Sequence, residues 1–485
     1  MSAIIRSLGL IALAGIAAPH AIGSALDAAL SIGWPYQIDY GEGVVWQQAL
    51  LILGPRAYSP GTGLPFVVFH YPPVYYLFVR LFGLFTSDYL SAGRLVASLC
   101  SFALGVGAGA LVYVTTNGRP RALRAGAAFA VACLVFSLPN IRAFGFLMRV
   151  DMLANALGVA GLLIAFTGRP GELRIGAALI VCTLAVFTKQ TELAAGITVF
   201  VMHGSRRPRQ TVGAAAVVAG VAVLAVGWLE WASAGGFLQH VVGYNINRYS
   251  GSILLSRLAT ERNNLPLIFA VMVAAGAALW APGDTRRRAM VVWFGLNGFS
   301  ILALGKSGAN FNYLNSLYVA GCVVFGVAVV DLVCISRRTA LAGSVLTLVV
   351  TGWVAQLPLR RLQAYLDTQA PAEQAALVAR IAVAAKPVAS DDVTLTLRAG
   401  KPILFEPAIV TELAATGRWD ETPLVQLIEA DGLAFVITDH ETLDDERRSP
   451  RIAAALNARF PRAEQVTPRH WLHLAPLDSW QVEPK

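Results

Sequence analysis

Charged residues are scarce in this sequence. Asp, Glu, Lys and Arg make up 14% of its 485 residues, whereas hydrophobic residues make up 56% and the mean hydropathy is +0.60. A soluble domain carries about 25% charged residues, so a chain of this length has too few to cover its surface. Long apolar runs recur over the first three-quarters of the chain. The composition excludes a soluble enzyme and predicts a multi-span membrane protein.

Lysine and cysteine are also sparse. Only two lysines, Lys189 and Lys306, precede Lys386, and the five cysteines all lie in apolar runs outside the C-terminal region. This excludes a disulfide framework and a cysteine-based metal site. Acidic residues are few before Leu359, where the net charge is +13, while the tail has a net charge of −4. The overall charge of +9 therefore gives no reason to expect a nucleic-acid partner.

Eleven apolar stretches predict eleven membrane spans. They lie near residues 8–30, 94–115, 123–139, 152–167, 174–188, 190–203, 211–229, 264–281, 289–305, 314–334 and 340–357. Longer mixed connections alternate with short arginine-rich ones, at 119–124, 169–174, 206–209, 286–288 and 337–338. Basic short loops stay in the cytoplasm. With the N-terminus inside, eleven spans put all the arginine-rich connections on that side.

The count of eleven spans depends on how three segments are interpreted. Lys189 interrupts the run 174–203, and because a lysine at mid-depth is costly we expect two short helices that turn there. Prolines leave too few helical residues in 66–85 for a crossing, so we expect a helix along the outer surface. A cleaved signal peptide is the alternative at the N-terminus, but a retained first span is favoured because the apolar run leads directly into an acidic motif.

The tail has the composition of a small α/β domain. Short strands are expected at 393–397, 402–405, 433–438 and 471–474, and helices at 372–385, 407–416, 422–431 and 450–460. We expect two domains: a transmembrane catalytic domain over 1–358, with an outer-surface loop at 33–93, and a soluble domain over 359–485 on the outer face.

The mixed connections hold polar clusters that are candidates for a site. Asp39 and Glu42 stand in Tyr36-Gln37-Ile38-Asp39-Tyr40-Gly41-Glu42-Gly43, where either an ordinary solvated loop or a general base at a membrane-surface cleft fits. Candidate substrate-binding residues follow in the next connection and at the start of the second span: His70, Tyr71, Tyr75 and Arg94. An interfacial aromatic belt is the alternative for the tyrosines.

Further clusters supply cations and amides. Arg149 and Asp151 fit a structural ion pair as well as a site, and Lys189 and Glu192 have the spacing of a helical pair. Lys306 is followed by Asn310, Asn312 and Tyr313, which is more polarity than a turn between spans requires. We expect Lys189, Lys306 and Arg149 to bind a donor phosphate, and the two asparagines and Tyr313 to bind substrate.

These residue types fit transfer from a lipid-linked phosphate. Cations stabilise a phosphate leaving group as its charge develops, and a carboxylate takes the proton of an attacking hydroxyl. The cytoplasmic connections offer only arginines, so we expect the chemistry on the outer face. No nucleotide sugar is available there. No cofactor is expected, and metal binding at Asp39, Glu42 and Asp151 lacks a tight ligand spacing.

The order of these features resembles the GT-C superfamily of polyprenyl-phosphate-sugar-dependent glycosyltransferases. One helix is followed by an acidic outer loop, a His/Pro-Pro/Tyr segment and an Arg at the start of the next span. Pro72-Pro73-Val74-Tyr75-Tyr76 is similar to the HPPLYY segment of protein O-mannosyltransferases and lipid A aminoarabinose transferases. Arg149-Val150-Asp151, Lys189-Gln190-Thr191, Asn310-Phe311-Asn312-Tyr313 and residues 417–424 resemble segments of an uncharacterised bacterial branch.

The resemblance implies a bacterial inner-membrane enzyme with an extracytoplasmic site. Asp39 would be the catalytic base, with Glu42 and Asp151 as candidates for a second acidic residue. The enzyme would transfer a sugar, with inversion, from a polyprenyl phosphate to a hydroxyl of a glycan, lipid or protein. The WWDYG signature of oligosaccharyltransferases is absent. A flippase of lipid-linked sugars is the main alternative and would predict an internal repeat; a structural assembly protein is the other.

Overall fold

The computed structural model describes residues 3–86, 88–168, 171–280, 285–359, 362–444 and 447–476. Its largest part is a bundle of long helices. These are α1 (Ala3–Gly33), α4 (Tyr89–Thr115), α5 (Arg121–Ser137), α7 (Asp151–Phe166), α8 (Glu172–Val186), α9 (Ala194–Gly204), α10 (Pro208–Ala232), α13 (Leu265–Trp280), α14 (Thr285–Gly298), α15 (Asn315–Ile335) and α16 (Arg337–Ala355).

Each of the eleven apolar stretches overlaps one of these helices. By length and composition, six helical stretches in the described part of the chain could cross a membrane: 8–33, 89–115, 208–232, 285–305, 311–335 and 337–355. The protein is therefore a multi-pass membrane protein, and the count of eleven spans stays a prediction.

Local sequence fixes where several helices begin. The Asp88 carboxylate accepts the backbone N–H groups of Leu90 and Ser91 and so caps α4. A capping box of Ser336 and Thr339 begins α16. Pro208 stands in the first turn of α10, where its missing N–H costs no hydrogen bond. Each cap satisfies or avoids backbone donors that a helix leaves unpaired at its start.

Small residues let the helices pack closely. A side chain added at Gly109 of α4 would come within 2.4 Å of the Ala128 carbonyl of α5, and one at Gly161 of α7 within 2.4 Å of the Cys182 sulfur of α8. α15 lies at the centre of the bundle, since 83% of its most apolar window is buried. The core of the bundle is thus built by close backbone approach, as is common between membrane helices.

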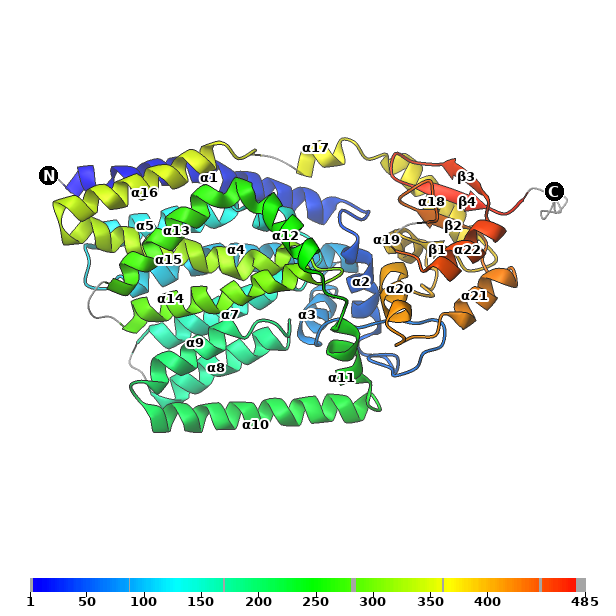
Figure 1. Ribbon diagram of the computed structural model, residues 1–485, viewed down its shortest axis with the longest axis horizontal. Coiled ribbons are helices and arrows are strands. Elements are labelled where there is room, and N and C mark those ends of the chain that lie inside the picture. Colours follow the sequence, from blue (N-terminus) through cyan, green and yellow to red (C-terminus); the bar gives the residue numbers. More distant parts are fainter. Residues whose placement is uncertain are drawn as a thin grey trace.

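The two ends of the bundle differ in charge and in what they carry. The C-terminal ends of α4, α7, α9, α13 and α15 and the N-terminal ends of α5, α8, α10, α14 and α16 lie at the end that holds the N-terminus, and the arginine-rich segments belong to these helix ends (Figure 1). Residues 281–284, between α13 and α14, lie outside the described residues. Residues 169–170 lie outside the described residues. Asp331 at this end pairs with Arg119 at 2.9 Å and Arg287 at 2.7 Å. The opposite end carries the C-terminal domain.

Short elements connect the long helices, and α2 lies between the bundle and that domain (Figure 1). They are α2 (Gly41–Leu51), α3 (Val74–Phe82), α6 (Pro139–Phe144), α11 (Gly236–Val241), α12 (Gly251–Thr260) and the 3-10 helices η1 (Gly243–Asn245), η2 (Glu261–Asn264), η3 (Phe299–Gly305) and η4 (Phe311–Leu314). The expected surface helix over 66–85 is α3 alone, because the chain is extended up to Pro73.

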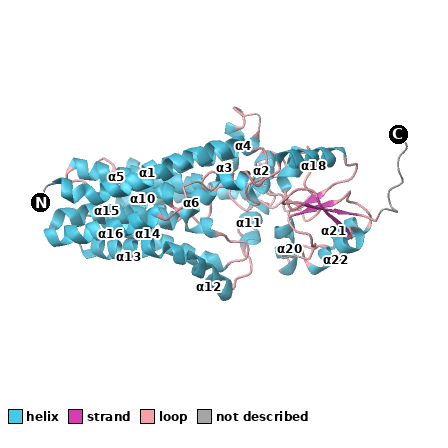
Figure 2. Ribbon diagram, turned by 90° about the horizontal axis from the view of Figure 1, so that it is seen from above, coloured by secondary structure: helices cyan, strands magenta, loops and turns pink. Residues whose placement is uncertain are grey.

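The C-terminal domain is a small sheet covered by helices (Figure 2). Its strands are β1 (Ala389–Ser390), β2 (Val436–Thr438), β3 (Arg462–Gln465) and β4 (Trp471–Leu474), in the order β1-β2-β4-β3, with β1 parallel to β2 and the other pairs antiparallel. Its helices are α17 (Leu362–Leu366), α18 (Pro371–Val383), α19 (Val393–Arg398), α20 (Pro407–Ala415), α21 (Thr422–Glu429) and α22 (Pro450–Arg459).

Two of the four expected strands were wrong. Residues 393–397 lie in α19, because the Asp392 side chain accepts the N–H groups of Thr394 and Leu395 and so starts a helix. Residues 402–405 are a loop, and Phe66 donates its backbone N–H to the Leu404 carbonyl there. The other two strands and all four expected helices are present, within a few residues at their ends.

The loop before α3 packs into the C-terminal domain. The Phe66 ring stacks on Trp419, with ring centroids 5.3 Å apart, and the Trp419 indole donates to the Thr62 carbonyl. Arg418 donates to the carbonyls of Gly243 and Ile246, which follow α11. The bundle and the domain are therefore joined by a common apolar core.

Candidate active site

A cavity of about 850 Å³ lies where the bundle meets the C-terminal domain. This volume lies within the range of about 300–1,000 Å³ that is usual for small-molecule sites. Residues far apart in sequence line it, from α2, the loops before α3 and α7, the segments 245–257 and 306–313, and α20. It brings together eight of the predicted site residues: Asp39, His70, Tyr71, Arg149, Asp151, Lys306, Asn310 and Tyr313.

Asp39 is a half-buried carboxylate at the wall of this cavity. Its Oδ2 accepts the backbone N–H of Gly41 at 3.1 Å and both the Nε and Nη2 of Arg149 at 3.1 Å. The side chain is 21% exposed. Within the described ranges, every hydrogen bond and ion pair of this carboxylate goes to Oδ2, so Oδ1 is left to accept a proton.

Glu42 holds the loop of Asp39 and does not line the cavity. Its Oε2 accepts the backbone N–H groups of Ile38 at 2.8 Å and Asp39 at 3.3 Å. Arg94 donates to both carboxylate oxygens at 2.8 and 2.7 Å, and neither side chain is exposed. Burial alone would raise the pKa of Glu42, but the Arg94 charge and these hydrogen bonds hold it below its usual range.

Arg149 and Asp151 each form an ion pair with another residue and not with each other. Arg149 reaches Asp39, while the Oδ1 of Asp151 accepts Lys189 at 2.7 Å and the Asn312 amide at 2.9 Å. Lys189 is 3% exposed, and its ammonium lies 4.4 Å from the centroid of the Tyr313 ring. A chain of alternating charge thus runs from the cavity into the bundle.

Lys306 lies in a loop that is held by a neighbouring segment. The Ser307 N–H donates to the Arg248 carbonyl at 2.8 Å, and the Ser250 N–H to the Gly305 carbonyl at 2.9 Å. Gly308 turns the chain with φ of +72°, a conformation that side chains disfavour. The Lys306 ammonium lines the cavity and has no partner among the residues described.

His70 is neutral at this site. Burial and the charge of Lys306, with a smaller contribution from His240, lower the pKa of His70 to about 3. Its backbone carbonyl accepts the amides of Gln190 and Asn245 at 3.0 and 2.9 Å. Burial, above all, raises the pKa of the neighbouring Tyr71, whose phenol therefore stays protonated. Both side chains act as neutral polar groups at the cavity wall.

Five predicted site residues lie outside the lining of the cavity: Glu42, Tyr75, Arg94, Lys189 and Asn312. The Tyr75 hydroxyl donates to the Gly93 carbonyl at 3.0 Å and is fully buried. Lys189 and Asn312 both donate to Asp151, which does line the cavity. Lys189 and Glu192 are not a helical pair, because both lie in the turn between α8 and α9 and Lys189 pairs with Asp151.

The structure adds residues that sequence reasoning missed. Tyr40, Arg248, Arg257, Glu406, Glu412 and Arg447 also line the cavity. The segment from Asn245 to Arg257 is rich in Asn, Tyr and Arg, and that composition was a usable signal. Nothing in the local sequence marks Glu406 or Glu412, since only the docking of the C-terminal domain brings them here.

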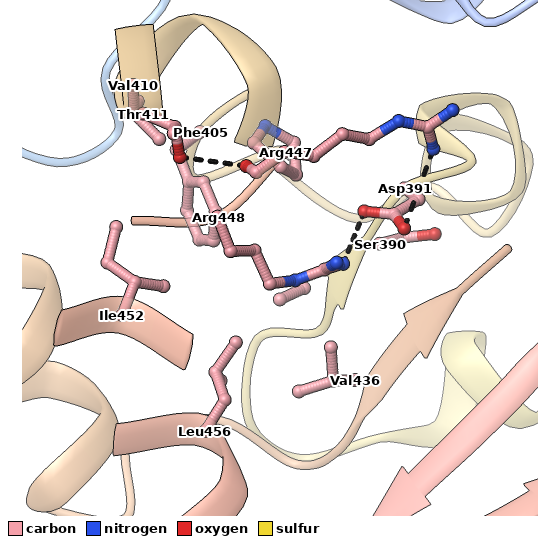
Figure 3. A pocket seen from close by; sticks show the side chains of 12 residues that line it. Ser390, Asp391, Phe405, Val410, Thr411, Val436, Arg447, Arg448, Ile452 and Leu456 are labelled. Atoms are coloured by element: carbon pink, nitrogen blue, oxygen red, sulfur yellow. Dashed lines mark hydrogen bonds and ion pairs between the residues drawn. The ribbon is translucent and has the colours of Figure 1, made fainter. Parts of the chain in front are cut away.

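A second, much smaller pocket of about 10 Å³ lies inside the C-terminal domain (Figure 3). Asp391 there accepts Arg448 at 2.6 Å and contacts Arg447 at 3.6 Å, and the Thr411 hydroxyl donates to the Arg447 carbonyl at 2.8 Å. The volume is about that of one water molecule. This pocket fixes the base of the Arg447 side chain and does not hold a sugar.

Metal ligands are not clustered in the described part of the chain. No group of three or more His, Cys, Asp or Glu side chains there has an arrangement that could hold a metal ion.

The sequence matches a family model, and the fold is similar to that of solved structures. Residues 69–305, just under half of the chain, match the family model of Glycosyltransferase family 87. The fold is similar to that of ArnT from Cupriavidus metallidurans bound to undecaprenyl phosphate, with a TM-score of 0.59 and 15% identity, over 94% of this chain and 97% of that one. It is also similar to the archaeal oligosaccharyltransferase AglB from Archaeoglobus fulgidus in complex with an inhibitory peptide and a dolichol-phosphate, with a TM-score of 0.51 and 11% identity, over 99% and 76% of the two chains.

A comparison with curated protein sequences gave no match. The family model and the shared architecture confirm the resemblance that the sequence motifs indicated. The chain is a membrane glycosyltransferase with the GT-C fold.

Proposed function

We propose that this enzyme transfers one sugar from a polyprenyl phosphate to a hydroxyl group of a glycan, lipid or protein, with Asp39 as the general base. The observation that carries the proposal is the shared cavity, which has a half-buried carboxylate, Asp39, and two cations, Arg149 and Lys306, on its walls. A transferase of this kind needs both groups at one reacting centre.

The proposed reaction is a single displacement. The acceptor hydroxyl attacks the anomeric carbon as Asp39 Oδ1 takes its proton, and the bond from that carbon to the phosphate oxygen breaks. The electron pair leaves with the polyprenyl phosphate, and the anomeric centre inverts. Arg149 supports the role of Asp39, because its two contacts to Oδ2 orient the carboxylate.

The donor phosphate is assigned to the cationic wall. Lys306 would bind it directly as a point charge, and Arg149 would share its charge between Asp39 and the phosphate. Lys189, the third predicted phosphate ligand, is buried against Asp151 and would act on the cavity only indirectly, through this ion pair. His70, Tyr71, Asn310 and Tyr313 line the same space and would contact the sugar or phosphate through neutral polar groups.

A lipid carrier is supported by the bound ligands of two proteins with a similar fold, undecaprenyl phosphate for ArnT and a dolichol-phosphate for AglB. The arginine-rich helix ends lie at the opposite end of the bundle from the C-terminal domain (Figure 1), and α20 of that domain lines the cavity. By the positive-inside rule, that end faces the cytoplasm. The cavity and the C-terminal domain would then lie on the extracytoplasmic face of a bacterial inner membrane.

A donor panel tests the proposal. Purified protein is incubated with undecaprenyl-phosphate-linked hexoses and pentoses, and donor consumption is followed for the wild type and for Asp39→Asn. We expect consumption of at least one donor by the wild type and a loss of about 10³-fold in the variant, with unchanged thermal stability. Full turnover by Asp39→Asn would remove Asp39 as the base, and no consumption of any donor would contradict the lipid-linked substrate.

A further inference from the structure

One short helix of the C-terminal domain contacts both halves of the site. α20 spans Pro407–Ala415, its N-cap residue is Glu406, and Glu412 lies near its C-terminal end. Both glutamates line the cavity. Neither has a role in the proposed reaction, yet each is hydrogen-bonded to a loop that carries a proposed functional residue.

Glu406 contacts the loop of the proposed base. The Tyr40 hydroxyl donates to Glu406 Oε1, and Tyr40 directly follows Asp39 in the chain. The backbone N–H groups of Ala408 and Ile409 donate to Glu406 at 3.2 and 3.1 Å, so the carboxylate is fixed by its own helix. The Arg447 guanidinium lies over the Tyr40 ring, 4.5 Å from its centroid, and so also holds this side chain.

Glu412 contacts the loop of the proposed phosphate ligand. Its Oε2 accepts the Ser307 hydroxyl at 3.1 Å and the Arg248 guanidinium at 3.0 Å, and its Oε1 accepts the Arg248 backbone N–H at 2.8 Å. Ser307 directly follows Lys306. Glu412 therefore holds together the two neighbouring segments, at Arg248 and at Ser307, that present Lys306 to the cavity.

We propose that α20 is a positioning element that sets the separation between the general base and the phosphate-binding lysine, with Glu406 and Glu412 as its two positioning residues. This inference rests on the proposed function. Asp39 and Lys306 belong to loops 267 residues apart in sequence, and a helix is a stiff spacer that rises about 1.5 Å per residue. Because a misplacement of about 1 Å costs about 100-fold in rate, such a spacer has a direct effect on turnover.

The two glutamates should affect different quantities. Glu406→Ala releases the Asp39 loop, so we expect kcat to fall about 10- to 100-fold while the Kd for undecaprenyl phosphate stays within about twofold. Tyr40→Phe removes the same contact from the other side and should give a similar fall, with no further loss in the double variant. Glu412→Ala releases the Lys306 loop and should raise the Kd for undecaprenyl phosphate about 5- to 10-fold, with kcat at saturating donor within about threefold. Ser307→Ala should weaken binding in the same direction.

The experiment measures binding of undecaprenyl phosphate by the full-length protein in nanodiscs, and turnover with the donor that the panel identifies. Glu429→Ala is the matched control, because it makes the same change at an exposed position of the neighbouring helix α21. The inference is overturned if Glu406→Ala and Glu412→Ala both behave like Glu429→Ala, or if each lowers kcat and affinity in proportion to its loss of thermal stability. The binding measurement needs no turnover, so a failure of Asp39 as the base is distinguishable from a failure of this inference.

Discussion

Arg94 and Glu42 form a two-pronged ion pair in which neither side chain is exposed to solvent. The guanidinium also donates to the carbonyls of Ser31, Trp34 and Tyr36. Taking two charges out of water is costly, and it is repaid only where the geometry is close and the remaining donors and acceptors are satisfied. This pair therefore joins the end of α1, the start of α4 and the loop that carries Asp39.

Removing one partner of this pair should destabilise the fold strongly. Arg94→Met leaves a buried carboxylate without its cation, so we expect a loss of about 3–5 kcal/mol in the free energy of unfolding. Arg398→Met is the matched control: its pair with Asp88 is partly exposed, at 23% and 15%, and should be worth about 1 kcal/mol or less. Reversible denaturation in detergent measures both. Equal losses in the two variants would show that burial of the Arg94 pair has no special weight.

The sequence places both Arg94 and Glu42 near the site, but it predicts Arg94 as a substrate-binding residue and Glu42 as a candidate second acidic residue. Each residue lies in a polar motif that is typical of a binding site. Nothing in a single sequence shows that two residues 52 positions apart form an ion pair with each other. The same limit applies to Lys189, which lies in the turn between α8 and α9, whereas its partner Asp151 begins α7. The sequence marks Lys306 in the same way, but in the structure its ammonium lines the cavity and has no partner among the described residues, so it is available to a ligand.

This difference predicts opposite effects for the two membrane-region lysines. Lys306→Ala removes a cavity cation that has no partner among the described residues, so we expect undecaprenyl phosphate binding to weaken about tenfold, or about 1.4 kcal/mol, with little change in thermal stability. Lys189→Met leaves Asp151 buried without its cation and should cost about 3–5 kcal/mol of stability. Ligand binding and thermal unfolding, measured on both variants, separate the two roles. A loss of stability in Lys306→Ala as large as that in Lys189→Met would contradict the assignment.

Arg149 should not be replaceable by lysine. Its Nε and Nη2 both lie 3.1 Å from Asp39 Oδ2, and a lysine ammonium cannot reproduce this two-nitrogen contact while also facing the cavity. We expect Arg149→Lys to lower kcat about 10- to 100-fold with the fold intact. Turnover on the donor found with the panel is the measurement, and Arg257→Lys, at another cavity arginine that donates to backbone carbonyls, is the comparison. Equal kcat values for wild type and Arg149→Lys would exclude orientation of Asp39 by the guanidinium fork.

Most of the helical architecture follows from the sequence, because apolar stretches of span length have few alternatives in a membrane. The eight predicted residues that line the cavity could be found because the mixed connections between spans gather polar and charged side chains beyond what simple turns require. The C-terminal domain was harder. The apolar, β-branched run Val393–Leu397 has strand propensity, but the Asp392 cap turned it into a helix. The cavity contacts of Glu406 and Glu412 depend on docking, which a single sequence does not encode in any local pattern.

The state of His70 gives a prediction for acid stability. Its pKa in the folded protein is about 3, below the usual 6.5, because it is buried and because Lys306 and His240 are nearby. In the unfolded chain His70 takes up a proton near pH 6.5, whereas in the folded protein it stays neutral until about pH 3. Stability is therefore unaffected by this group above pH 6.5 and falls by about 1.4 kcal/mol for each pH unit below it. At pH 5 the loss from His70 should be about 2 kcal/mol.

Thermal unfolding between pH 5 and pH 7.5 tests this, with His70→Gln as the variant that cannot titrate. We expect the variant to lose less stability than the wild type over this range, and the two curves to run parallel above pH 6.5. Lys306→Ala removes the neighbouring charge that lowers the pKa of His70, so its acid sensitivity should lie between those of the other two proteins. If wild type and His70→Gln lose stability equally down to pH 5, His70 is not held neutral by the folded site.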